Sequence, residues 1–343
     1  MRPERPLKAP DISIVIVNWN TRDLLHQCLE SVSRTTEDEP AYHVEVIVID
    51  NASADDSVAM VRSDFPTVRV IASDENTGFA SGCNRGIRLS SAPYVLLLNP
   101  DTIVLPGAIA RTARFMDESP GAGAATCRVL NHDRSDQVCH ADFPSLTKIV
   151  VGGSSFRAAF HSVFLTKGFF RHAGLSRQER MERRQVDWVM GAFMMLRRTA
   201  LADSGLLDES LFMYGEEADL CYRLHRRGWE IWYVPDGEIT HLVGKSREQI
   251  ETVQDIDWLL ETRCYFFWKH FGRGRMLASC GVGTAAGLAK LGVYALLATL
   301  PFGDRRRRQV RAKRDQFRHE VAWYVRHRRR LLSSDGPMSV RSC

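Results

Sequence analysis

Four short apolar runs, separated by segments of helical periodicity, occupy the beginning of the chain. They cover residues 12–17, 44–49, 68–71 and 94–98, and each is continuous and rich in β-branched side chains. Such runs are typical of strands that are buried on both faces of a parallel sheet. Because a helical pattern follows each of the first three runs, their order predicts a doubly wound α/β sheet.

Polar residues follow every run, at the edge of the sheet where α/β proteins bind their ligands. A single Asp or Asn at such a place is most often a turn or N-cap residue. Sets at four successive strand ends favour a nucleotide site, in which Asp50 accepts a hydrogen bond from a pyrimidine N–H while Asn and Ser groups reach the ribose. The candidates are Asn18, Asn20, Asp50, Asn51, Ser53, Asn76, Gly78, Asn84 and Asn99.

Asp101 lies just beyond the fourth run, where its carboxylate could hold Mg²⁺ or Mn²⁺ against a diphosphate. A metal there would neutralise the charge that develops on the leaving group. The plain alternative is a turn Asp before Thr102. His241 follows a further apolar run at 231–234, and such a histidine is by itself more often structural than a ligand.

A second acidic group, Glu216, Glu217 and Asp219, opens an amphipathic segment that stops at Gly228. Acidic residues stabilise a helix N-terminus by opposing its dipole, and this is the plain interpretation. Three carboxylates so close together also suit a general base whose pKa is set by its negative neighbours.

Taken in order, these motifs resemble the signature of family 2 glycosyltransferases of the GT-A fold, in their bacterial rhamnosyltransferase-like branch. The resemblance covers about residues 11–245 and rests on residues 14–20, 50–53, 76–84, 99–102, 212–223 and His241. It implies a Rossmann-like sheet that binds a nucleotide-diphospho-sugar.

The resemblance also implies roles for single residues. Asp50 reads the donor base, Asp101 binds the Mn²⁺ or Mg²⁺ ion that holds the diphosphate, and His241 is a further metal ligand. Glu217 deprotonates the acceptor hydroxyl for one in-line displacement, which inverts the anomeric carbon. The acceptor side is lined by Asp187, Trp188 and Gly191.

Two positions depart from the family pattern. Asn99 stands where many members have the first Asp of a paired-Asp metal motif, so the metal site rests on one carboxylate. Glu217 stands where Asp is commoner, which lengthens the base by one methylene.

Residues 246–343 are expected to form a helical, basic region that attaches to a membrane. Residues 276–302 carry Lys290 as their only charge and are long enough to span a bilayer, although small residues keep their hydropathy modest. From Asp304 onward, 13 Lys and Arg stand against 4 Asp and Glu, and export of such a tail opposes the positive-inside tendency. We therefore expect a peripheral or re-entrant element on anionic lipid, with a soluble helical hairpin as the alternative.

These features predict a metal-dependent, inverting hexosyltransferase at the cytoplasmic side of the cell membrane. Its donor is a dTDP- or UDP-sugar, with rhamnose as one candidate, and its acceptor is a lipid-linked saccharide or a surface polysaccharide. The scattered cysteines and the lack of a signal-peptide pattern agree with a cytoplasmic catalytic part. Nucleic-acid binding by the Arg-rich tail is not expected, because few aromatic residues are interleaved.

Two alternatives from other classes remain open at the level of sequence. One is a non-catalytic nucleotide-sugar-binding protein on the same fold, against which the intact Asp101 and Glu217 argue. The other is a nucleotidyltransferase, which would normally show a Gly-rich phosphate loop early in the chain.

Overall fold

The computed structural model describes residues 9–38, 41–151, 180–242, 252–300 and 304–332. The chain divides into two compact units, Met1–Phe143 with Ala159–Gln249, and Pro144–Ala158 with Ile250–Cys343. The predicted boundary at residue 245 lies near the second end of the first unit, and residues 144–158 belong to the same compact unit as the C-terminal helices.

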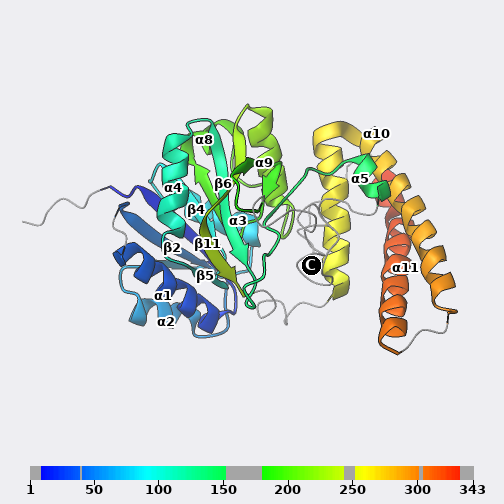
Figure 1. Ribbon diagram of the computed structural model, residues 1–343, viewed down its shortest axis with the longest axis horizontal. Coiled ribbons are helices and arrows are strands. Elements are labelled where there is room, and N and C mark those ends of the chain that lie inside the picture. The colour runs from blue at the N-terminus through cyan, green and yellow to red at the C-terminus, as the bar shows by residue number, and fades with distance from the viewer. Residues whose placement is uncertain (1–8, 39–40, 152–179, 243–251, 301–303, 333–343) are drawn as a thin grey trace, which may run out of the picture. The chain divides into compact units, whose positions relative to one another are not determined.

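The predicted strands form the parallel half of a large sheet. Strands β1 (Ile12–Asn18), β2 (Val44–Asp50), β3 (Arg69–Ala72) and β4 (Tyr94–Leu98) lie in the order β3-β2-β1-β4. They are connected by α1 (Arg22–Asp38), α2 (Ser57–Asp64) and α3 (Phe79–Leu89), as Figure 1 shows.

Strand β1 is covered on both faces, which explains its unbroken apolar run. Ile14 belongs to the core cluster that contains Leu25 and Leu29 of α1. On the opposite face, Val15 lies so close to α3 that a Cβ added at Gly86 would meet its Cγ1 at 2.3 Å.

The other half of the sheet makes it mixed instead of parallel throughout. Strand β10 (Phe193–Arg197) runs antiparallel to β4 and to β6 (Ala122–Leu130). Strand β11 (Glu230–His241) is parallel to β6 and antiparallel to β5 (Thr102–Val104) and β8 (Arg184–Gln185). Three helices, α4 (Ala108–Glu118), α8 (Arg198–Ser204) and α9 (Glu216–Arg226), and a two-stranded sheet of β7 (His140–Ala141) and β9 (Trp188–Val189) complete the unit.

This topology decides which chain segments meet at the ligand edge. Because β10 is antiparallel to β4, its first residue Phe193 pairs with Leu98, the last residue of β4. The predicted short strand at 231–234 continues through a bulge, and His241 at its end pairs with Thr102. The segments before Phe193, after Leu98 and around His241 therefore share one edge of the sheet.

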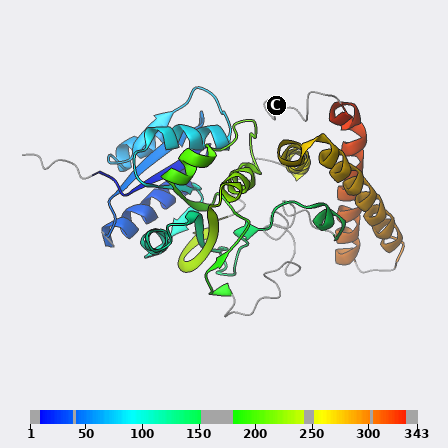
Figure 2. The same cartoon turned by 90° about the horizontal axis from the view of Figure 1, so that it is seen from above.

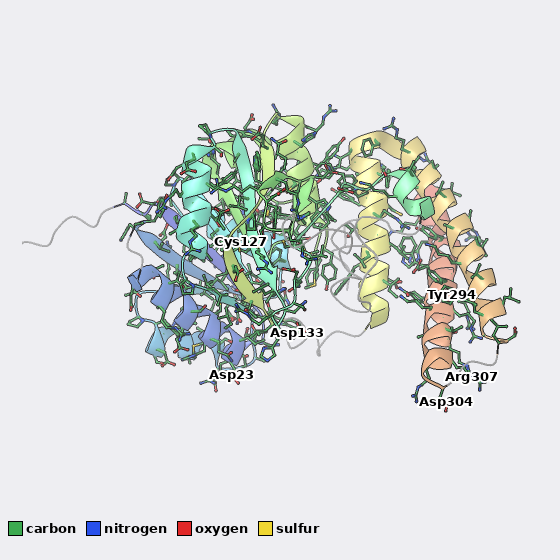
Figure 3. All side chains as sticks on the ribbon, in the orientation of Figure 1. Asp23, Cys127, Asp133, Tyr294, Asp304 and Arg307 are labelled. Carbon is green, nitrogen blue, oxygen red and sulfur yellow. The ribbon has the colours of Figure 1, made fainter. Side chains whose placement is uncertain are left out.

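In the described residues, the second unit consists of α5 (Leu146–Val151), α10 (Thr252–Leu297) and α11 (Asp304–Leu332). Gly272 has φ 80° and divides α10 into two helical parts. The second part and α11 lie side by side in Figures 1 and 2, and Tyr294, labelled in Figure 3, contacts Phe317 of α11 at 5.4 Å between ring centroids. The buried core of the unit comprises Ile149, Leu260, Cys264, Phe267, Met276, Cys280, Trp323, Tyr324 and Leu331.

Small residues on α10 face α11 and permit close packing of the two helices. A Cβ on Gly283 would meet the Tyr324 hydroxyl at 2.6 Å, and one on Gly287 would meet Val321 at 2.9 Å. A different face of α10 carries Leu288, Val293 and Leu296, which are 52%, 56% and 68% exposed. The abundance of small residues thus has a packing reason, and the large apolar residues remain uncovered within the described residues.

Candidate functional site

The ends of β1 and β2 form one hydrogen-bonded group around Asp50. Its carboxylate accepts from Asn18 Nδ2 at 2.8 Å, from Ser53 Oγ at 2.7 Å and from the Ser53 backbone N–H at 2.9 Å. Asn20, with φ 53°, closes the group, because its backbone N–H donates to Ser53 Oγ and its Oδ1 accepts from the N–H of Ala54. The structure therefore brings together four of the predicted nucleotide residues from two strands.

Asn51, Asn76 and Gly78 lie together at the start of α3. Asn51 Nδ2 donates to the Gly78 carbonyl at 3.0 Å, while its Oδ1 is buried and has no partner in the described residues. Gly78 has φ +85°, and a Cβ there would meet the Phe212 carbonyl oxygen at 2.6 Å, so only glycine fits. Asn76 Oδ1 accepts from the Gly78 N–H in a local turn.

Asn84 has a structural role in this arrangement. It is 1% exposed, its Nδ2 donates to the Leu207 carbonyl and to Glu209, and its Oδ1 accepts from the Leu207 N–H. These bonds use both ends of the amide to tie α3 to the segment before α9. We therefore leave Asn84 out of the nucleotide site.

The two predicted metal ligands lie in direct contact although 140 residues separate them. His241 Nε2 is 3.1 Å from Asp101 Oδ1, and both side chains are nearly buried, with 13% and 9% exposure. The other ring nitrogen, Nδ1, is 3.0 Å from Gln137 Nε2. Asn99, the other candidate beside Asp101, binds through its backbone, with its N–H donating to the Ala192 carbonyl.

The donor set suits a divalent cation that a ligand helps to hold. No group of three His, Cys, Asp or Glu side chains placed to hold a metal occurs among the described residues. A carboxylate and an imidazole are acceptable ligands for Mn²⁺, and Mg²⁺ is commonly held by one or two carboxylates together with substrate phosphates and water. The pair therefore fits a metal that binds together with a diphosphate.

The first two carboxylates of the acidic group at the start of α9 differ in exposure, because Glu217 is partly accessible and Glu216 is buried. Glu217 is half-buried, and its Oε1 accepts from the Gly191 backbone N–H at 3.1 Å. Glu216 is 2% exposed, and its Oε2 has no partner in the described residues. Tyr214 and Gly215, with φ 69° and 90°, form the turn that starts the helix. Of the two carboxylates, only Glu217 can meet an acceptor directly.

Burial perturbs both carboxyl groups. Burial, followed by the charge of Glu217, raises the pKa of Glu216 well above its ordinary value. Burial also raises the pKa of Glu217, and the Gly191 N–H partly offsets this shift by favouring the charged form. Glu217 combines a raised pKa with a partly accessible carboxylate, which suits a general base, whereas Glu216 is buried.

The remaining predicted residues hold neighbouring segments in place. Asp219 is 1% exposed and pairs with Arg223 at 2.8 Å. Asp187 accepts from the Phe143 backbone N–H, and Trp188 Nε1 donates to the Asp142 carbonyl. Gly191 touches the site itself, through its N–H on Glu217.

Sequence reasoning missed three residues that frame the site. Arg223 donates to the carbonyls of Ser204, Gly205 and Leu206 and so fixes the loop before α9. Gln137 partners His241, and Arg128 joins Asp136 to Glu238. None has a sequence signal, except that Arg223 stands four residues after Asp219 on a predicted helix.

Comparison with known families matches residues 10–254 to the family described as "Glycosyltransferase like family 2". An N-acetylglucosaminyl-diphospho-decaprenol L-rhamnosyltransferase of Mycobacterium tuberculosis is 30% identical over 246 residues, which cover 67% of this chain and 75% of that protein. The rhamnosyltransferase WbbL of Escherichia coli K12 is 25% identical over 239 residues, which cover 67% and 83%.

Among solved structures, a mannosyltransferase from Pyrobaculum calidifontis, in complex with GDP-Man and Mn²⁺, is similar with a TM-score of 0.54. The match covers 94% of this chain and 90% of that one at 14% identity, so it bears on the fold alone. The mixed sheet described above is accordingly of the GT-A type, as predicted, and the nucleotidyltransferase alternative is excluded by the family match. The chain is a glycosyltransferase and belongs to glycosyltransferase family 2.

Proposed function

We propose that the protein is an inverting glycosyltransferase that moves a hexose, with rhamnose as the first candidate, from a dTDP- or UDP-sugar to a lipid-linked saccharide or a growing polysaccharide. The names of the rhamnosyltransferase relatives support the sugar and the acceptor class. The observation that carries the proposal is the meeting of Asp101 with His241 at the edge of the sheet where Gly191 holds Glu217.

The donor would occupy the carboxyl ends of β1, β2 and β4. Asp50 is oriented by Asn18 and Ser53, and its Oδ1 accepts only the Ser53 N–H among the bonds described, so a lone pair remains for a pyrimidine N–H. The unpartnered Oδ1 of Asn51 supplies a second acceptor close by. Asp101 and His241 would hold Mn²⁺ or Mg²⁺, which stabilises the negative charge of the departing diphosphate.

The acceptor would approach along Glu217. This carboxylate takes the proton of the attacking hydroxyl, and the oxygen displaces the nucleoside diphosphate from the opposite face of the anomeric carbon, which inverts its configuration. The raised pKa of Glu216, caused by its burial and by the charge of Glu217, disfavours a second charge beside Glu217. A Cβ at position 191 would lie only 3.0 Å from Glu217 Oε1, so glycine leaves room there for the carboxylate.

Glu217 and Asp101 substitutions test the site, and donor specificity tests the sugar. Wild-type protein should release nucleotide from dTDP-rhamnose or a UDP-hexose when Mn²⁺ and a polyprenyl-diphospho-saccharide are present, and transfer should invert the anomeric configuration in an NMR assay of the product. Retention of configuration would overturn the assigned mechanism. Binding of the donor without any transfer would favour the non-catalytic alternative.

We also propose that the helical unit attaches to the membrane surface at the cytoplasmic side. Within the described residues one helix, Ile256–Leu297, is long and apolar enough to span a membrane. An 18-residue stretch of it has a mean hydropathy of 1.4, and 11% of that stretch is buried. Lys290 of α10 lies over the Phe317 ring of α11, so α11 is packed against this part of α10. Insertion of α10 into the bilayer would therefore take α11 with it. Since α11 is rich in arginine, a spanning α10 would draw charge into the bilayer or break this packing, and a surface-bound hairpin avoids both.

Two surface variants test this attachment. Replacing Leu288, Val293 and Leu296 with Ser, or the four arginines at 305–308 with Ser, should lower binding to vesicles that contain anionic lipid. Binding of the wild type and of the apolar variant, which both keep the four arginines, should fall steeply with salt, because charge attraction is screened, whereas binding of the arginine variant should depend little on salt. Equal sedimentation of all three proteins with vesicles would place the attachment elsewhere.

A further inference from the structure

Gln137 contacts His241 of the Asp101–His241 pair, and it belongs to none of the sequence motifs described above. Its backbone N–H donates to the Val129 carbonyl at 2.8 Å, and the residue is only 5% exposed. The amide nitrogen Nε2 is 3.0 Å from His241 Nδ1. The amide oxygen Oε1 is buried and has no partner in the described residues. The amide therefore has one polar neighbour there, the histidine ring.

The hydrogen bonds of His241 couple its tautomer to the orientation of the Gln137 amide. When Gln137 donates through Nε2, Nδ1 of the ring is the acceptor and the ring proton resides on Nε2, from which it is donated to Asp101. A protonated Nε2 has no lone pair for a cation. If His241 is to bind a metal beside Asp101, the proton must lie on Nδ1, and a partner must accept it there.

A half-turn of the Gln137 amide supplies that partner. It places Oε1 toward Nδ1, where the oxygen accepts the ring proton and leaves the Nε2 lone pair directed at Asp101. Because the far end of the amide has no hydrogen bond to lose within the described residues, the turn breaks only the bond to His241 and replaces it with one of opposite direction. An amide can serve either tautomer, because it donates through Nε2 and accepts through Oε1.

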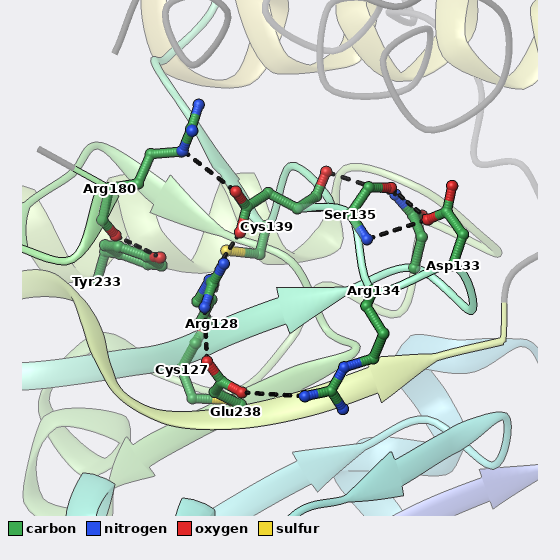
Figure 4. A network of polar contacts seen from close by, with 11 residues as sticks. Cys127, Arg128, Asp133, Arg134, Ser135, Cys139, Arg180, Tyr233 and Glu238 are labelled. Atoms are coloured by element: carbon green, nitrogen blue, oxygen red, sulfur yellow. Dashed lines mark hydrogen bonds and ion pairs between the residues drawn. The ribbon is translucent and has the colours of Figure 1, made fainter. Parts of the chain in front are cut away.

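An ionic network holds the segments that carry this pair while the amide turns. Figure 4 shows Arg128 beside Glu238, which lies on β11 ahead of His241. Arg128 also pairs with Asp136, which precedes Gln137. Both contacts are 2.6 Å, and Arg180 adds a third at 3.2 Å to Asp136. Arg128 therefore ties together the two segments that carry Gln137 and His241, independently of the bond between their side chains.

We propose that Gln137 is a positioning residue that selects the tautomer of His241, donating to Nδ1 in the metal-free protein and accepting from Nδ1 when a divalent cation is bound. This inference rests on the proposed function, in which Asp101 and His241 hold the metal. It makes the affinity for the cation depend on a residue that does not touch it.

The test measures Mn²⁺ affinity of the full-length protein, by the electron paramagnetic resonance signal of free Mn²⁺. Gln137→Met keeps the volume and loses the acceptor, so the dissociation constant should rise about 10–100-fold, as is typical when the partner of a metal-binding histidine is lost. Gln137→Glu keeps an acceptor and should retain binding. Ser135→Ala alters the same turn without touching His241 and should bind like wild type. In a His241→Ala background, Gln137→Met should have no further effect.

Nitrogen-15 spectra of the histidine ring supply a readout that a merely structural role would not change. In wild type the ring proton should lie on Nε2 without metal and on Nδ1 with Mg²⁺, whereas Gln137→Glu should hold it on Nδ1 without metal. Wild-type Mn²⁺ affinity in Gln137→Met, or a proton on Nε2 in metal-free Gln137→Glu, would overturn the inference alone. Equal Mn²⁺ affinity in Asp101→Asn and wild type would overturn the metal site itself.

Discussion

Replacement of Glu217 by Gln separates the chemistry of the site from its architecture. The Gly191 backbone N–H donates to the native Glu217 carboxylate at 3.1 Å, and the amide oxygen of Gln can still accept this hydrogen bond. The loop before β10 should therefore stay in place. The amide cannot take a proton at neutral pH. Removal of a general base typically costs about 10²–10⁴-fold in rate, or roughly 3–5 kcal/mol of activation free energy.

Stability should change little and in a predictable direction. Burial raises the pKa of Glu217, so the charged carboxylate is disfavoured in the folded chain. The stability that the protonated form contributes is fully present below the unfolded pKa of about 4.3 and is lost as the pH rises through the raised value. Gln resembles the protonated form, and Glu217→Gln should therefore melt no lower than wild type at pH 7–8.

The assay is single-turnover transfer together with calorimetric titration of the nucleotide. We expect a large fall in transfer rate with unchanged donor affinity, and loss of the acidic limb of the pH–rate profile, because protonated Glu217 in wild type cannot act as a base. Glu217→Asp should keep part of the activity, since Asp is the commoner family residue. If Glu217→Gln transfers within about threefold of wild type, well short of the loss expected for a general base, the base is another group, and Asp187 and Asp219 are the next to test.

Four further changes have distinct expected outcomes. Asp101→Asn should abolish transfer and weaken donor binding in Mn²⁺ while leaving the melting temperature close to that of wild type. Gly191→Ala should lower the rate by up to ~10²-fold, because its Cβ would displace Glu217 Oε1; unchanged kinetics would contradict this. Glu216→Gln should raise the melting temperature at pH 8 and lose that advantage toward pH 4, measured by calorimetry, because burial raises the pKa of the native carboxyl well above normal. Gly78→Ala should destabilise by about 2–5 kcal/mol in denaturant unfolding, owing to its positive φ and the Phe212 carbonyl.

Sequence patterns identified those parts of the fold that depend on local periodicity. The four parallel strands and the three helices between them follow from continuous apolar runs and 3.6-residue spacing, although β3 lies at the end of the sheet and is not buried on both faces as predicted. The mixed half of the sheet was not predictable in this way, because β10 and β11 acquire their direction from long-range pairing with β4 and β6. The packing of α5 in the helical unit likewise depends on long-range contacts.

The residues of the candidate site were likewise predictable from the sequence only in part. Asp101 and His241 could be singled out because they follow strands, and the structure brings them into contact. The difference between Glu216 and Glu217 could not be read from two adjacent identical letters, since it arises from the turn at Tyr214 and Gly215 and from Gly191 in a distant segment. Gln137 contacts His241 and Arg128 contacts Glu238, each about 100 residues away along the chain, and no local pattern encodes such pairs.

Helix α5 lies in the middle of the catalytic sequence, yet Ile149 is buried in the core that Leu260 and Cys264 help to form. The helical unit is therefore not a detachable tail, because the chain contributes to it at two separate places. A protein cut after residue 251 would keep α5 without its covering helices and expose an apolar surface to solvent. Exchanging C-terminal regions between relatives would leave a mismatched α5 unless residues 144–158 were transferred as well, so in this architecture the catalytic sequence and the helical unit must be inherited together.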